Sequence, residues 1–156
     1  MMKPVIIGIV QEKSHVGDFQ ANQAMIAAYY ERVKDPQSAQ YCDLLVFHEM
    51  TLCGYPIGDY AYHHDFYAKQ DEFMQALAQL TKPKGAPAMV VGGVRHQWVK
   101  DKLKIYNSLF LLKSGQITPI HDKILRPITA YLMKSVILTR GSNAPPLIVM
   151  VLKLVC

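Results

Sequence analysis

Residues 43–56 read DLLVFHEMTLCGYP, and this stretch decides how the rest of the chain is interpreted. Its first six residues are mostly apolar, which is typical of a short strand buried in a sheet. Glu49 follows that strand directly, and the letters GYP at positions 54–56 predict a tight turn. In α/β proteins, functional side chains gather at the carboxyl ends of buried strands. Glu49 is therefore the first candidate for a functional residue.

The segments on either side of this stretch alternate between strand and helix patterns. A strand and a helix precede it, and a helix, a strand and a two-stranded hairpin follow it. We expect strands over Pro4–Val10, Asp43–His48, Ala88–Val94, Ile105–Leu112 and Gln116–Ile120, and helices over Phe19–Lys34, capped by Asp18, and Asp65–Leu80. This order predicts an α/β fold in which helices cover a sheet.

The spacing of apolar residues also predicts which face of each helix packs on the sheet. In the first helix, the packed face is expected to hold Ala21, Met25, Ala28, Tyr29 and Arg32, with Ala24 and Ala28 allowing close packing. In the second helix, the expected stripe is Phe66, Phe73, Leu77 and Leu80.

Lys123 is the second candidate, because it lies just beyond the predicted hairpin. A lysine and a carboxylate at the ends of neighbouring strands can polarise each other and hold or move a proton. A nucleophilic site would need a third, reactive group, for which a cysteine is the obvious choice. On residue type alone, however, a strand-end glutamate or lysine is more often a solvated surface residue.

Several segments, in order, resemble the N-terminal half of the nitrilase superfamily of carbon–nitrogen hydrolases. They are VGDFQAN at 16–22, DLLVFHEMTLCGYP at 43–56, YNSLFLLKSGQI at 106–117 and HDK at 121–123. The family pattern has F-P-E-x-x-x-x-G-Y-P around its glutamate, a Y-N-[SA] strand, and a lysine after the next hairpin. The first segment and the L-x-G-Y-P loop are similar to the glutaminase branch found in glutamine-dependent NAD synthetases.

The resemblance implies a fold and roles for three residues. The fold would be the N-terminal half of a nitrilase-type α-β-β-α sandwich, incomplete in this chain. Glu49 would be the general base, Lys123 the lysine that steadies the tetrahedral intermediate, and Tyr55 part of the glutamine pocket. The family's glutaminase step uses no cofactor or metal, whereas ATP and magnesium belong to a separate synthetase domain. Its members are oligomeric.

The chain departs from the family pattern at two places. His48 stands where the family has proline, and we expect it to be a tolerated, neutral surface histidine. After Lys123 the family continues into L-P-N-Y-G-V-F-D-E, whereas this chain reads KILRPITAYLMKSVIL. We therefore expect a partial hydrolase domain over residues 1–125 and an out-of-frame tail over residues 126–156, without the family's nucleophilic cysteine.

The genetic code supports this view of the tail. Restoring one nucleotide in the codon of Arg126 allows the tail to be regrouped as LPNYGVFDEKRYFNKG, which is the missing family motif. Some positions are forced whichever synonymous codons are used: Met133-Lys134 yields a glutamate codon, and Met150-Val151 yields a glycine codon. Cys156 would then be the last residue of an out-of-frame segment. We expect it not to act as the nucleophile, because such a segment has no scaffold that could position its thiolate. The tail is expected to lack defined packing.

Composition and charge exclude some other classes of function. Four of the 17 basic residues and none of the 12 acidic residues lie in 126–156, so the net charge of +5 does not mark a nucleic-acid surface on the domain. No stretch reaches the roughly 18 apolar residues of a membrane span. The three cysteines suit a reducing, cytoplasmic setting and show no zinc spacing. The expected partner is a small amide such as glutamine, with no nucleic acid and no membrane.

Two alternatives remain open at this level. The chain could be part of a stand-alone amidase or carbamoylase of the same superfamily, because the substrate is decided in loops. It could also be a non-catalytic interaction module that pairs an exposed sheet edge with an intact homologue.

Overall fold

The computed structural model describes residues 5–63 and 65–123 of the 156-residue chain. The predicted out-of-frame tail and Cys156 therefore lie outside the described residues. The elements, in order, are β1 (Ile7–Ile9), α1 (Phe19–Val33), β2 (Leu44–Val46), the 3-10 helix η1 (Gly58–Tyr62), α2 (Phe66–Leu80), β3 (Ala88–Val99), β4 (Lys102–Lys113) and β5 (Gln116–Asp122). The predicted order of strands and helices is confirmed, and η1 occupies part of the segment that was expected to be a loop.

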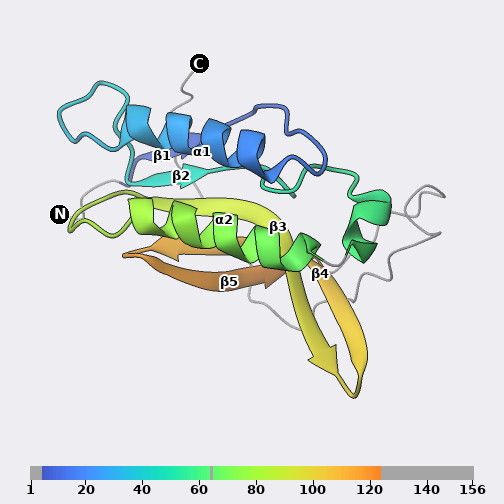
Figure 1. Cartoon of the computed structure of the whole chain (residues 1–156). Helices are drawn as coiled ribbons and strands as arrows, with labels where there is room; N and C mark the ends of the chain where they lie inside the picture. Colours follow the sequence, from blue (N-terminus) through green and yellow to red (C-terminus); the bar gives the residue numbers. More distant parts are fainter. Residues whose placement is uncertain (1–4, 64, 124–156) are drawn as a thin grey trace.

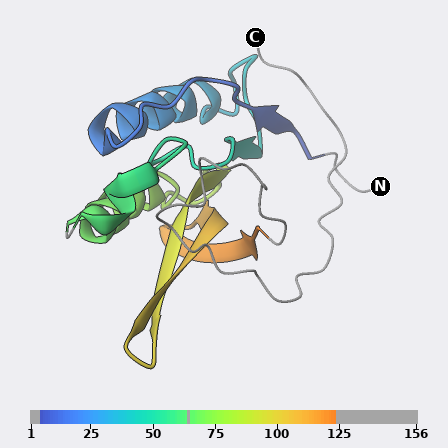
Figure 2. The same cartoon turned by 90° about the vertical axis from the view of Figure 1, so that its right-hand side faces the viewer.

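The five strands form one sheet in the order β1-β2-β3-β4-β5. Strands β1, β2 and β3 run parallel, and β4 and β5 continue the sheet as an antiparallel meander. Both helices lie on the same side of this sheet, α1 over β1 and β2 and α2 beside β3 (Figures 1 and 2). The architecture is thus the α/β arrangement that the sequence predicts, with helices on one face.

Strands β3 and β4 are longer than expected and form an arm that leaves the body of the molecule (Figures 1 and 2). Only Ala88–Val90 of β3 pairs with β2, so beyond that point the strand has β4 as its neighbour. The arm closes through Lys100 and Asp101, which both have positive φ, as a two-residue hairpin turn of the primed type requires. This turn was missed because neither residue is a glycine or an asparagine.

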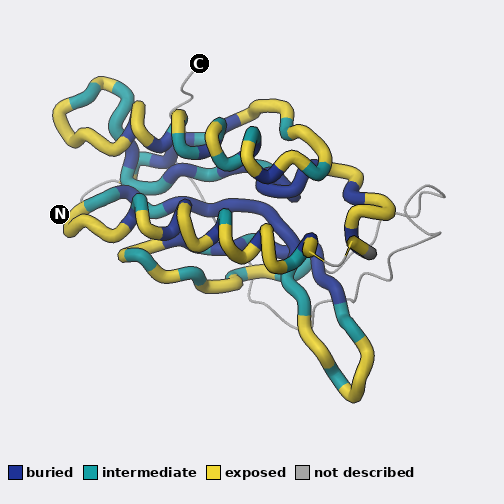
Figure 3. Tube along the Cα trace, in the orientation of Figure 1, coloured by how far each residue is buried: buried dark blue, intermediate teal, exposed yellow. Residues whose placement is uncertain are grey.

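The core lies between the two helices and the sheet (Figure 3). In α1 the buried residues are Phe19, Asn22, Ile26, Tyr30 and Val33, while Ala24 and Ala28 are exposed. The predicted packing face of α1 is therefore wrong, because it took Asn22 for a surface residue. In α2, Phe66 and Leu77 are buried as expected, but Phe73 and Leu80 are only partly buried.

The predicted helix cap is confirmed. The Asp18 carboxylate accepts a hydrogen bond of 2.9 Å from the Ala21 backbone N–H. Gly17, which precedes the cap, has a φ of +75°, a conformation that glycine adopts without steric cost. Its N–H donates to the Cys53 carbonyl oxygen at 2.9 Å, so the start of α1 is held against the loop after β2.

Candidate active site

Glu49 lies in the loop that follows β2, and this loop is held against β3. The Leu52 N–H donates to the Gly92 carbonyl oxygen at 3.0 Å. A Cβ atom at Gly92 would come closer than 3.0 Å to the His48 carbonyl oxygen and the Met50 nitrogen. The loop can approach β3 this closely only because position 92 has no side chain.

A second set of contacts ties the same loop to the segment that precedes α1. The side-chain amide of the fully buried Asn22 donates to the carbonyl oxygens of Leu52, at 3.0 Å, and His15, at 2.7 Å, and it accepts from the His15 N–H at 2.7 Å. All the hydrogen-bonding groups of this amide are thus used, which rigidifies the loop that carries Glu49.

His48 also joins these two segments. Its Nδ1 atom lies 2.8 Å from the Glu49 carbonyl oxygen, and its Nε2 atom lies 2.7 Å from the Glu12 carbonyl oxygen and 3.1 Å from the Ser14 hydroxyl. The side chain is therefore only partly exposed and contacts the backbone of both segments, whereas we expected a histidine without such contacts. The sequence pattern could not reveal this, because Glu12 and Ser14 are far from His48 along the chain.

Lys123 reaches Glu49 across the end of the sheet. Its Nζ atom lies 2.8 Å from Oε1 and 2.8 Å from Oε2 of Glu49. The side chains of Lys123 and Glu49 are 35% and 42% exposed, so the pair faces solvent and can meet a small molecule. The predicted proximity of these two residues is confirmed, whereas their catalytic roles stay predictions.

Asn107 of β4 completes the arrangement, although sequence reasoning gave it no role. Its Nδ2 atom donates to Oε1 of Glu49 at 2.6 Å, and its carbonyl oxygen accepts from the Lys123 backbone N–H at 2.8 Å. One residue therefore holds both members of the pair. The available signal was its place in the YNS segment, on a strand adjacent to the lysine.

These contacts distinguish the two carboxylate oxygens of Glu49. Among the described residues, Oε1 accepts from both Asn107 and Lys123, whereas Oε2 accepts only from Lys123. A carboxylate oxygen can accept two hydrogen bonds, and Oε1 already accepts two from the described residues whereas Oε2 accepts one. Oε2 is therefore the oxygen with a free lone pair that can take a proton from an incoming group. The Lys123 ammonium beside it can stabilise negative charge that develops on a bound substrate.

Tyr55 is 45% exposed, and among the described residues no hydrogen bond joins it to Glu49 or Lys123. Its assignment to a glutamine pocket stays a prediction. A surface groove of about 670 Å³ lies elsewhere, along the C-terminal ends of α1 and α2, and its lining includes none of the predicted site residues.

Neither described cysteine is suited to attack a substrate beside Glu49. Cys42 and Cys53 are both completely buried and form no disulfide. Burial raises the pKa of the Cys42 thiol, and it raises the pKa of Cys53 to about 12. Both thiols therefore stay protonated near neutral pH, and a protonated thiol is a poor nucleophile.

Neither a metal-binding cluster nor a membrane-spanning helix is present among the described residues. Within residues 5–63 and 65–123, no group of three or more His, Cys, Asp or Glu side chains is placed to hold a metal ion. Within the same part of the chain, no helix is long and apolar enough to cross a membrane.

Comparison with known proteins points to one family. The family model described as carbon-nitrogen hydrolase matches residues 6–150. This match continues past residue 125, the predicted end of the hydrolase domain. The segment 124–156 is outside the described residues, so that boundary stays a prediction.

Two curated relatives are both described as glutamine-dependent NAD(+) synthetases. The glutamine-dependent NAD(+) synthetase of Synechocystis is 36% identical over 92 residues, which is 57% of this chain and 16% of that protein. The glutamine-dependent NAD(+) synthetase of Thermotoga maritima is 27% identical over 126 residues, or 81% of this chain and 20% of that protein. The chain therefore matches at most a fifth of the length of these two relatives.

Solved structures show that the fold is shared. A glutamine-dependent NAD+ synthetase from Acinetobacter baumannii superposes with a TM-score of 0.74 at 22% identity, covering 91% of this chain and 25% of that chain. An amidase from Nesterenkonia superposes with a TM-score of 0.65 at 16% identity, covering 90% of this chain and 49% of that chain. At these identities the likeness establishes the nitrilase-type fold and not the substrate.

Proposed function

Because the chain belongs to the carbon–nitrogen hydrolase family, we propose that Glu49 and Lys123 are the general base and the charge-stabilising lysine of an amide-hydrolysing site. The observation that carries this proposal is the contact of Lys123 Nζ with both carboxylate oxygens of Glu49, at 2.8 Å each. Asn107 supports it, because its hydrogen bond to Oε1 leaves Oε2 as the proton acceptor.

The chemistry that this pair supports is nucleophilic hydrolysis of an amide. A thiol gives its proton to the Glu49 carboxylate, and the sulfur attacks the amide carbon. The proton then passes to the departing ammonia, and water releases the acyl group in a second step. The Lys123 ammonium stabilises the oxyanion of each tetrahedral intermediate. Proton transfer by Glu49 and oxyanion stabilisation by Lys123 need a carboxylate and a cation side by side, and the two groups are in contact here.

The proposed substrate class is the side-chain amide of glutamine, with ammonia as the product used in NAD synthesis. Two relatives described as glutamine-dependent NAD(+) synthetases support this choice. We further propose that the 156-residue chain by itself releases no ammonia. Neither buried cysteine can serve as the nucleophile, and Cys156 lies in the segment that we interpret as out of frame.

Two assays test these proposals. The purified 156-residue chain, incubated with glutamine, should release no ammonia above the buffer control. Ammonia release that disappears in Cys156→Ala and persists in Cys53→Ala would instead make Cys156 the nucleophile. The second assay uses a chain whose reading frame is restored by one nucleotide at codon 126.

In the restored chain, ammonia release from glutamine should appear and should be lost in both Glu49→Gln and Lys123→Met. Activity that survives both substitutions would refute the assigned roles. Hydrolysis of acetamide or of N-carbamoyl amino acids in preference to glutamine would instead identify a stand-alone amidase or carbamoylase.

A further inference from the structure

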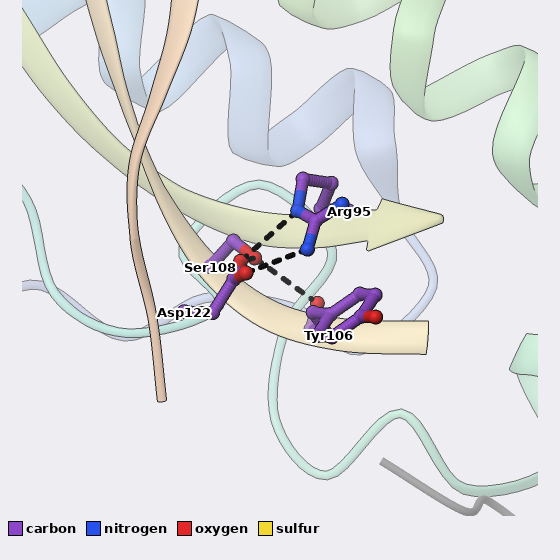
Figure 4. A network of polar contacts seen from close by, with 4 residues as sticks. All are labelled: Arg95, Tyr106, Ser108 and Asp122. Atoms are coloured by element: carbon purple, nitrogen blue, oxygen red, sulfur yellow. Dashed lines mark hydrogen bonds and ion pairs between the residues drawn. The ribbon is translucent and has the colours of Figure 1, made fainter. Parts of the chain in front are cut away.

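A second polar cluster is built from residues next to those of the candidate site in sequence: Asp122 precedes Lys123, and Ser108 follows Asn107. The carboxylate of Asp122 accepts hydrogen bonds from Arg95 Nε at 3.1 Å, Arg95 Nη2 at 2.6 Å and the Ser108 hydroxyl at 2.5 Å. The Arg95 guanidinium also lies over the Tyr106 ring, 3.9 Å from its centroid (Figure 4). The cluster thus joins three strands, since Arg95 is on β3, Tyr106 and Ser108 are on β4, and Asp122 ends β5.

This cluster and the candidate site lie on opposite faces of the sheet. A Cβ atom at Gly93 would meet side-chain atoms of Gln70 and Met74, so that position faces α2. Gly93 pairs with Ser108, and Ser108 pairs with Asp122, so these positions share the α2 face. Asn107 and Lys123 are their immediate neighbours in sequence and therefore face the other way.

The register of β5 decides which side chain reaches Glu49. β5 is an edge strand of seven residues, and its pairing with β4 is interrupted by a register shift between Leu109 and Phe110. Beyond that irregularity, a slip by one residue would turn Lys123 toward α2 and place Asp122 on the side of Glu49. Two carboxylates would then face each other, and the ion pair would be lost.

We propose that Asp122 is a positioning residue, which fixes the end of β5 through Arg95 and Ser108 so that Lys123 reaches Glu49. The inference rests on the proposed function, in which Lys123 acts on the substrate. Among the described residues, the Asp122 carboxylate makes no hydrogen bond to the side chain of Glu49 or Lys123, and its partners, Arg95 and Ser108, are on the α2 face. The bidentate geometry suits this task, because a guanidinium and a carboxylate fix both distance and direction.

The test uses the full 156-residue chain and does not require activity. The chain is treated with a limiting amount of an amine-acylating N-hydroxysuccinimide ester, and acylation at each lysine is measured by mass spectrometry. Lys123 of the unaltered chain should react more slowly than Lys113, which ends β4 and is exposed. In Asp122→Ala, acylation at Lys123 should rise by about two- to fivefold, the size expected for loss of one partly exposed ion pair.

Three further variants make the result decisive. Asp122→Asn keeps the shape and an acceptor for Ser108, so it should restore part of the protection. Asp71→Asn, which removes an exposed carboxylate from α2, should leave Lys123 unchanged. Glu49→Gln should raise acylation at Lys123 directly, and if it does not, the Glu49–Lys123 pair and the proposed function fail together.

The results for the Asp122 variants are interpreted separately from the Glu49→Gln result. If Glu49→Gln raises acylation at Lys123 but Asp122→Ala does not, the positioning role is overturned while the proposed function stands. If Asp122→Ala raises acylation at Lys113 and Lys123 alike, Asp122 serves general stability, and the positioning role is again overturned.

Discussion

At the scale of single residues, the site depends on how closely the Glu49 loop approaches β3. The sequence could predict Glu49 and Lys123, because both follow strands and match a family pattern. It gave only an indirect signal for Asn107, through the YNS segment, and none for the bridging position of His48, because both depend on contacts between segments far apart in the chain. The need for glycine at position 92 could not be predicted either, because only the folded structure shows that a side chain there would overlap the Glu49 loop.

Replacing Gly92 with alanine should therefore destabilise the chain. The added methyl would overlap backbone atoms of His48 and Met50, which cannot move without shifting the Glu49 loop. We expect the free energy of unfolding in urea to fall by about 1–3 kcal/mol, the usual cost of overpacking. Gly93→Ala is the matched control: its methyl would meet the Gln70 and Met74 side chains, at 3.0 and 3.3 Å, and should cost less. Equal losses for the two variants would refute this explanation of Gly92.

At the scale of elements, the order of strands and helices and the packed face of α2 could be predicted from hydrophobic patterns, but the packed face of α1 could not. One reason is that the helices bury side-chain amides. Asn22 of α1 and Gln70 of α2 lie in the core because they satisfy backbone groups there. A pattern of apolar residues treats such amides as surface residues and so rotates the predicted face of α1. The arm of β3 and β4 was likewise cut short, because its polar outer residues resemble a loop.

The contact of Gln70 with β3 predicts a specific loss. Its Nε2 donates to the Val94 carbonyl oxygen at 2.5 Å, and its Oε1 accepts from the Val94 N–H at 2.7 Å. Gln70→Ala leaves both backbone groups of Val94 without these partners, which should cost about 1–3 kcal/mol of unfolding free energy. Gln79→Ala, at an exposed position of the same helix, should change stability by less than about 0.5 kcal/mol. A Gln70→Ala loss no larger than that of Gln79→Ala would show that the amide does not anchor α2.

The end of β5 predicts a dependence of stability on pH. Burial raises the pKa of Asp122, but hydrogen bonds from Arg95 and Ser108 outweigh it and hold the pKa below its ordinary value of 3.8. The carboxylate therefore stabilises the fold above about pH 4, and this contribution is lost as the pH falls below that value. The difference in unfolding free energy between the unaltered chain and Asp122→Asn should shrink as the pH is lowered from 6 to 3. A difference that grows over this range would contradict the assigned direction.

At the scale of the whole molecule, the described residues place a carboxylate, a lysine and an amide at one end of a five-stranded sheet with helices on one face (Figure 1). We propose that this arrangement is the base and lysine part of a carbon–nitrogen hydrolase site. The α/β class and the position of this part were accessible from sequence because strand ends meet at one edge of a sheet. The interpretation of residues 126–156 as an out-of-frame tail concerns residues that the structure does not describe, and it stays a prediction.

The central claim is that Glu49 and Lys123 act as one unit in this chain, and a double-mutant cycle measures that directly. The free energy of unfolding in urea is determined for the unaltered chain, Glu49→Gln, Lys123→Met and the double variant. The contact at 2.8 Å predicts a favourable coupling of roughly 0.5–1 kcal/mol, the upper part of the range for partly exposed pairs. A coupling indistinguishable from zero would contradict the account, because the two side chains would then not be paired in solution.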